Sequence, residues 1–263
     1  MQEEIKELNP LGYKPVRKLL KSLAIPAIIA NLVNALYNVV DQIFIGQRVG
    51  YLGNAATNIA FPITTMCLAI GLTLGIGGAS NFNLELGKGY PEKSKHTAGT
   101  AASTLIIIGI ILCISVRIFL EPLMISFGAT DKILEYSMEY TGITSYGIPF
   151  LLFSIGVNPL VRADGNAKYS MIAIVIGAIL NTILDPLFMF VYNWGIAGAA
   201  WATVISQIVS ATLLLIYFPR FKSVKFSLND FIPQLHYLKR IISLGFASFI
   251  YQFSNMIVLV TTN

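Results

Sequence analysis

The segment Pro26-Ala-Ile-Ile-Ala-Asn-Leu-Val-Asn-Ala-Leu-Tyr-Asn-Val-Val-Asp41 carries the strongest indication of how this chain folds. It lies in an apolar run, residues 19–46, that exceeds the ~20 residues needed for a helix to cross a bilayer. Its polar residues recur at spacings of three and four, which places them on one helix face: Asn31, Asn34, Asn38 and Asp41. We therefore expect a membrane helix with one polar stripe, loosened at Pro26 because proline lacks the backbone N–H.

The rest of the chain is equally apolar. Of its 263 residues, 55% are hydrophobic and 12% are charged, and the mean hydropathy is +0.70; a soluble domain carries about 25% charged residues. Helical spans are predicted at 19–46, 55–84, 98–120, 138–161, 169–192, 197–218 and 240–262. In hydrocarbon the backbone must be paired internally, and the ~10-residue alternating segments of a β-barrel are absent. The predicted fold class is an all-α integral membrane protein.

The domain organisation follows from a weak internal repeat. Lys18-Leu-Leu-Lys-Ser-Leu23 resembles Lys239-Arg-Ile-Ile-Ser-Leu244, so the seventh span looks like a second copy of the first. Repeats of this kind are common in secondary transporters. We expect a six-helix lobe over 1–218, a cytoplasmic or interfacial connector over 219–239, and the start of a second, truncated lobe over 240–263.

Basic residues predict the orientation. Fifteen of the 18 Lys and Arg residues fall in the N-terminal tail and the even-numbered loops, including Arg162 and Lys168 in the fourth loop. The positive-inside rule then places the N-terminus in the cytoplasm, in a multi-pass protein of the plasma membrane, the inner membrane of a bacterium. Anionic lipid headgroups account for the net charge of +5, and no nucleic-acid partner is implied.

Two aspartates are the only acidic residues well inside the apolar runs; Glu139 falls at the end of its span. A carboxylate at bilayer depth costs about 2.5–3.5 kcal/mol on insertion scales, so Asp41 and Asp185 are predicted to be functional. No Lys or Arg lies at their depth in the predicted spans. Polar residues recur near them at one-turn spacing: Asn181 before Asp185, and Ala199, Thr203 and Gln207 in the sixth span.

Two interpretations of these carboxylates remain open. Removal from water disfavours the charged form, so a buried carboxyl can exchange a proton near neutral pH. Alternatively, the oxygens of Asn181, Asp185, Thr203 and the Ala199 carbonyl suit a hard cation such as Na⁺. Isolated Asn, Ser and Thr residues are more often contacts between helices, and the glycines are more often close-packing positions.

Other chemistry finds little support. Cys67 and Cys113 lie in different spans, so neither a disulfide nor a metal site is expected. Both histidines fall in loops, and no hydrolytic or zinc-ligand arrangement such as H-E-x-x-H is present. We expect no cofactor, no resident metal beyond the coupling ion, and no enzymatic activity.

Three motifs, together with Thr203, resemble the multidrug and toxic compound extrusion (MATE) antiporters. They are Pro26 with Tyr37-Asn-x-x-Asp41 in the first span, the loop Arg162-Ala-Asp-Gly-Asn-Ala-Lys-Tyr169, and Asn181-x-x-x-Asp185-Pro186. The resemblance covers the whole chain, as an N-terminal lobe plus the start of helix 7.

The resemblance implies a twelve-helix transporter in two lobes that exports drugs and organic cations by antiport with H⁺ or Na⁺. It implies a cavity that uses Tyr37, Asp41, Asn181, Asp185 and Thr203, with Pro26 as a hinge. Asn34, Asn38 and Gln207 are our further candidates for the substrate cavity. We expect a monomer when full length, one that needs its second lobe. The alternatives are a lipid-linked oligosaccharide flippase of the same superfamily, which would need a more basic cavity, and a transport-inactive half.

Overall fold

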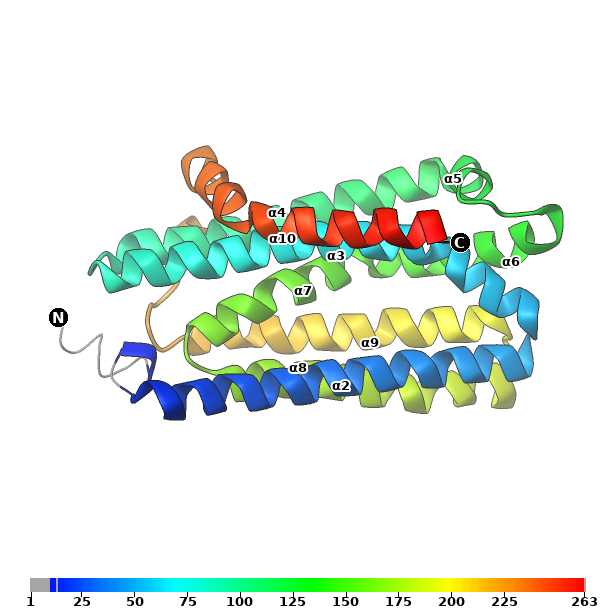
Figure 1. The fold of residues 1–263 in the computed structure, drawn as a ribbon, viewed down its shortest axis with the longest axis horizontal. Helices are drawn as coiled ribbons and strands as arrows, with labels where there is room; N and C mark the ends of the chain where they lie inside the picture. Colours follow the sequence, from blue (N-terminus) through cyan, green and yellow to red (C-terminus); the bar gives the residue numbers. More distant parts are fainter. Residues whose placement is uncertain (1–9, 13, 263) are drawn as a thin grey trace.

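The computed structural model describes residues 10–12 and 14–262, and the side chains of 11–12 and 14–254. Every regular element among these residues is helical (Figure 1). The longer elements, in chain order, are α2 (Val16–Arg48), α3 (Tyr51–Gly87), α4 (Pro91–Ile118), α5 (Leu120–Ser126), α6 (Asp131–Thr144), α7 (Ile148–Ala163), α8 (Ala167–Pro186), the π-helical turn η3 (Leu187–Val191), α9 (Ile196–Tyr217) and α10 (Leu235–Thr262).

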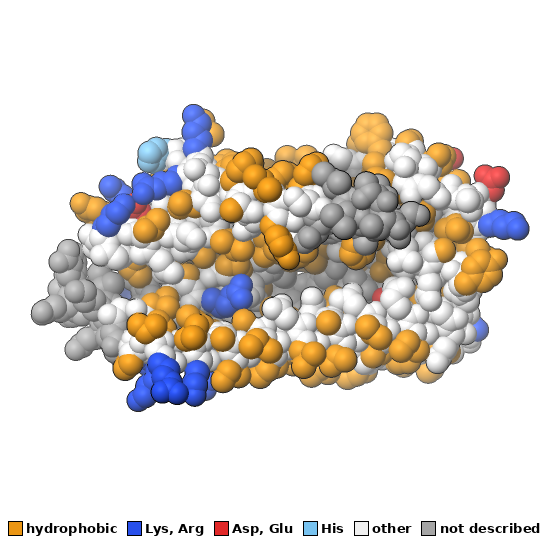
Figure 2. Space-filling view, in the orientation of Figure 1, with side chains coloured by type: hydrophobic (Ala, Val, Ile, Leu, Met, Phe, Trp, Pro, Cys, Tyr) orange, Lys and Arg blue, Asp and Glu red, His pale blue; other side chains and the backbone are white. Residues whose placement is uncertain are grey.

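Six segments among the described residues are both long enough and apolar enough to cross a membrane. They are Val16–Arg48, Tyr51–Gly87, Pro91–Ile118, Asp131–Ala163, Ala167–Val191 and Ile196–Arg220. Large apolar side chains stay exposed along them, among them Ile28, Ile111 and Ile183. In Figure 2 apolar side chains cover the length of the molecule, whereas most charged side chains gather at its two ends. The predicted all-α membrane fold is confirmed.

The spans differ from prediction at several boundaries, and two of the differences change the description of the helices. The predicted span 138–161 is two helices, α6 and α7, separated by a 3-10 turn at Ser145–Gly147. Pro149 follows this turn and cannot donate the next helical hydrogen bond, which explains the break. The seventh helix begins at Leu235 rather than at residue 240, so the connector is shorter than expected.

The helices form two groups. α2, α8 and α9 lie side by side, whereas α3, α4, α7 and α10 pack together (Figure 1). Glycines permit the close contacts in the second group: a Cβ on Gly75 of α3 would lie 2.5 Å from the carbonyl oxygen of Gly156 in α7. Likewise, a Cβ on Gly77 would collide with the carbonyl oxygen of Ile241 in α10. Small residues at helix contacts let the backbones approach, as is usual in membrane bundles.

We call the end of the bundle where α2, α4 and α8 begin the basic end. There Asp164, in the loop between α7 and α8, is fully buried. Its carboxylate accepts hydrogen bonds from the Tyr217 hydroxyl at 2.8 Å and from the backbone N–H groups of Lys222 and Ser223, each at 2.9 Å. The motif around Asp164 therefore holds the connector after α9 against the end of α7.

Candidate functional site

A cavity of about 620 Å³ lies between the two groups of helices. Side chains from α2, α3, α6, α7, α8 and α9 line it, most of them apolar, amide or hydroxyl groups. In Figure 2 the molecule is visibly hollowed between its two halves, and a basic side chain is recessed in the hollow. Among the described residues that line the cavity, only Asp41 and Arg162 carry a charge.

The polar face of α2 supplies one wall. The helix is continuous from Val16 to Arg48 with proline inside it, and the predicted residues of this face line the cavity: Pro26, Asn31, Asn34, Tyr37, Asn38 and Asp41. Asn38 donates a hydrogen bond to the backbone carbonyl of Asn34 at 2.7 Å, so part of the stripe is satisfied by its own helix.

The two aspartates meet at the end of the cavity opposite the basic end. Asp41 is 7% exposed and Asp185 is 0% exposed, and their carboxyl groups lie within hydrogen-bonding reach of each other. One oxygen of each, Asp41 Oδ1 and Asp185 Oδ2, has no hydrogen-bond partner among the described residues. Two carboxylates in contact repel each other when both are charged, so the pair suits a bound proton or cation.

Asn181 links the aspartates to α9. Its side-chain amide donates to Asp185 Oδ1 at 3.3 Å and to Thr203 Oγ1 at 3.4 Å. The carbonyl oxygen Oδ1 of Asn181 is buried without a partner among the described residues. A carboxylate oxygen that lacks a donor is free to accept a proton, and carboxylate and amide oxygens together can coordinate a hard cation.

A local irregularity accompanies Asp185. Pro186 cannot donate to the carbonyl four residues earlier, and the chain continues as the π-helical turn η3, in which the N–H of Tyr192 donates to Leu187 at 3.0 Å. Single π-turns inside helices often occur at functional sites. The sequence signal for this feature is the Asp-Pro pair itself.

Of two further predicted residues, Gln207 and Ala199, only the first lines the cavity. Gln207 lines the cavity, and its buried Oε1 has no partner within the described part of the chain. The side chain of Ala199 is fully buried against Ile45 and Met189 and does not line the cavity.

Tyr140 and Arg162 line the cavity but were not among the predicted site residues. Tyr140 of α6 lies near both aspartates and within hydrogen-bonding reach of Thr203. Arg162, which the sequence interpretation counted with the loops, faces the cavity from the last turn of α7. The polar spacing of Tyr140 and Thr144 was the available signal for α6; for Arg162 no local signal separated it from other loop cations.

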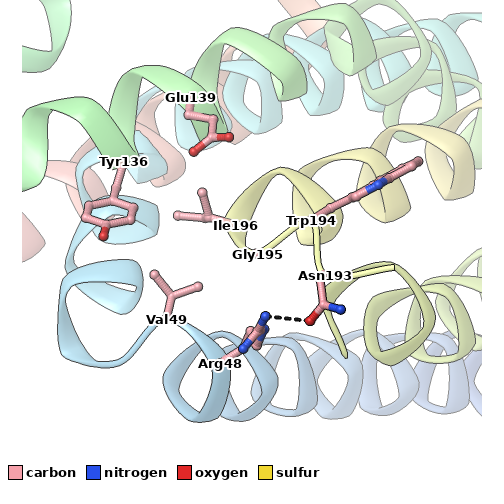
Figure 3. Close-up of a pocket in the computed structure, with 8 residues that line it drawn as sticks. All are labelled: Arg48, Val49, Tyr136, Glu139, Asn193, Trp194, Gly195 and Ile196. Atoms are coloured by element: carbon pink, nitrogen blue, oxygen red, sulfur yellow. Dashed lines mark hydrogen bonds between the residues drawn. The ribbon is translucent and has the colours of Figure 1, made fainter. Parts of the chain in front are cut away.

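A shallower pocket of about 370 Å³ lies at the end opposite the basic end (Figure 3). In it the guanidinium of Arg48 donates to Asn193 Oδ1 at 2.7 Å and to the Met189 carbonyl at 3.0 Å. Arg48 therefore holds the turn between α8 and α9 and does not neutralise the buried aspartates. Within the described residues, no group of three His, Cys, Asp or Glu side chains is placed to hold a metal ion.

Comparisons with known proteins agree with this geometry. The MatE family model matches residues 26–187. "Multidrug export protein MepA" of Staphylococcus haemolyticus is 25% identical over 238 residues, 89% of this chain and 52% of the relative, so the chain spans about half the length of such curated relatives.

Two solved structures share the fold over 98% of this chain at 28% identity. "Crystal structure of MATE in complex with MaD3S" has a TM-score of 0.88 and is covered over 57% of its length. A second structure has a TM-score of 0.85 and is covered over 56% of its length. It is described as "Reverse polarity of binding pocket suggests different function of a MOP superfamily transporter from Pyrococcus furiosus Vc1 (DSM3638)". The match to the family model, the helical bundle and the polar cavity agree. This chain belongs to the MatE family and corresponds to the N-terminal lobe of MATE transporters.

Proposed function

We propose that this chain forms the ion-coupling and drug-binding lobe of a multidrug exporter that works by antiport with H⁺ or Na⁺. The observation that carries the proposal is the buried pair Asp41 and Asp185, which meets at one end of an open cavity without a Lys or Arg partner among the described residues. The name of the MepA relatives, multidrug export protein, supports the same activity.

The proposed mechanism depends on the charge of the Asp41 and Asp185 pair. With the pair ionised, the cavity attracts an organic cation, and aromatic and amide groups of α2 and α6 contact its apolar surface. Entry of a proton or Na⁺ neutralises the pair, which weakens binding of the cation and favours another packing of α2, with Pro26 as the hinge. One elementary charge that crosses the membrane is worth about 2.3 kcal/mol per 100 mV, enough for modest uphill export.

The orientation and location complete the proposal. The basic end, with Arg17, Lys18 and Lys21 at the start of α2, would face the cytoplasm of a plasma membrane, as the positive-inside rule requires. An oligosaccharide flippase is less well supported, because Arg162 is the single basic residue among the described lining residues.

The test measures linkage, because coupling between two ligands of one protein is reciprocal. Ethidium binding to the purified chain is titrated at pH 5.5 to 8.5, with and without Na⁺. We expect ethidium affinity to fall as protons or Na⁺ fill the site, and the ion that causes the fall is the coupling ion. Asp41→Asn should remove this dependence, whereas Glu121→Gln, at an exposed acid, should keep it. An Asp41→Asn protein that retains the full ion dependence would contradict the assignment.

A further inference from the structure

The cavity has an electrical polarity that cation export does not require. At one end lie Asp41 and, against it, Asp185; from the other end Arg162 faces the same space. Side chains in a helix lean toward its N-terminus. The N-terminus of α2 is at the basic end, whereas that of α7 is at the opposite end. Asp41 and Arg162 therefore both lean into the cavity.

The positive charge of Arg162 is not neutralised. Its guanidinium makes no ion pair or hydrogen bond with a side chain or backbone group in the described part of the chain. The nearest carboxylate in sequence, Asp164, accepts hydrogen bonds from Tyr217, Lys222 and Ser223 instead. A guanidinium in a partly enclosed space needs an acceptor when its water is displaced, because an unpaired charge away from water is costly.

The neighbours of Arg162 leave it free for a ligand. One turn earlier on α7, Asn158 donates to the Ser170 carbonyl of α8 at 3.2 Å and accepts from the Ser170 hydroxyl at 2.6 Å. These two hydrogen bonds join α7 to α8 and set the position of Arg162 along the axis of α8. Fifteen positions of α8 separate Ser170 from Asp185, which is roughly 22 Å at about 1.5 Å per residue.

We infer that Arg162 forms an anion-binding subsite, so that the cavity takes an elongated amphiphile with a cationic group at the Asp41 end and a carboxylate at the Arg162 end. The guanidinium fork matches a carboxylate with two parallel hydrogen bonds, which is a geometry that a lysine cannot give. This inference rests on the proposed function, because it extends the substrate class of the same cavity from cations to long zwitterions.

The probes are ω-trimethylammonio carboxylic acids and their methyl esters, with chains of four, eight and twelve carbons. Each acid and its ester share the cationic group and differ in the anionic one. Binding to the purified chain is measured by calorimetry in dodecyl maltoside, a detergent without phosphate. The readout is the ratio of the ester Kd to the acid Kd. Partition of each probe into detergent is the same for every variant, so it cancels when the ratios of two variants are compared.

We expect the twelve-carbon acid to gain at least about tenfold from Arg162, the usual size for a bidentate charged pair. Arg162→Gln should therefore lower the ratio about tenfold for the longest pair and leave the four-carbon pair unchanged, since that acid is too short to span the cavity. Lys168→Gln is the matched control, because it removes an exposed cation from the first turn of α8, six residues after Arg162. The ester affinity of Arg162→Gln reports whether the cavity is still folded.

Each other outcome decides against a stated part of the argument. If Arg162→Gln weakens acid and ester equally, Arg162 only supports the end of α7 and the inference is wrong, while the proposed function stands. If added phosphatidylglycerol displaces the acid from the wild type but not from Arg162→Gln, the subsite belongs to a lipid headgroup rather than to a substrate. If neither the esters nor ethidium bind, the proposed function fails together with the inference.

Discussion

Removing the Asp164 carboxylate tests the role of an acid that accepts hydrogen bonds from three donors of the described chain. Asp164→Ala strands three donors, of which the first and last are buried and the second is part-buried: the Tyr217 hydroxyl, the N–H of Lys222 and the N–H of Ser223. Each buried donor left without a partner costs about 1–3 kcal/mol. Because the connector can move toward water at the membrane surface, we take the lower end, a loss of about 3 kcal/mol in the free energy of unfolding.

The assay is thermal unfolding of the purified chain in detergent. For a chain of this size 1 kcal/mol corresponds to about 2–4 °C, so Asp164→Ala should lower Tm by about 6–12 °C. Tyr217→Phe removes one donor and its bond together and should cost about 1 kcal/mol. Glu121→Ala, at an exposed acid, should be within about 0.5 kcal/mol of wild type. An Asp164→Ala protein as stable as Glu121→Ala would show that these hydrogen bonds do not stabilise the chain.

Two further predictions concern contacts of α3 with neighbouring helices, one of packing and one of charge. Gly75→Ala should lower stability by about 1–3 kcal/mol, because its Cβ would lie 2.5 Å from the backbone oxygen of Gly156 and the two helices would have to separate. The control is Gly87→Ala, which has nothing within 4 Å and should be neutral or stabilising in Tm. Arg240→Gln should lower Tm by removing a cation 3.3 Å from the buried Glu85, and 1 M NaCl should shrink that difference; an equal loss at both salt concentrations would contradict an ionic origin.

The sequence predicted most reliably those features that follow from placing a residue in hydrocarbon instead of water. Apolar runs of membrane length predicted six of the helices, because hydrocarbon leaves a buried backbone few other structures. The cost of a carboxylate in the same runs singled out Asp41 and Asp185. The boundary between α6 and α7 was missed, although Gly147 and Pro149 stood in the predicted span, because apolarity alone does not register a turn.

Contacts between distant segments were decided by packing. The sequence identified Asp41 and Asp185 singly, but only the fold brings α2 and α8 together so that the carboxyls touch. In the sequence Tyr140 shared only a one-turn polar spacing with Thr144, and Arg162 resembled the other loop cations. Both residues join the site because α6 and α7 turn them toward the cavity.

The amino-acid sequence alone was thus enough to predict a helical membrane protein with two acids that are costly in hydrocarbon. The packing of the helices was needed to learn that these acids share one end of a cavity and that an arginine faces them from the other. Desolvation acts on each residue according to its own place in a membrane helix, so it can be inferred from the sequence. The arrangement of charges depends instead on the distances between helices. Close packing at residues such as Gly75 sets those distances.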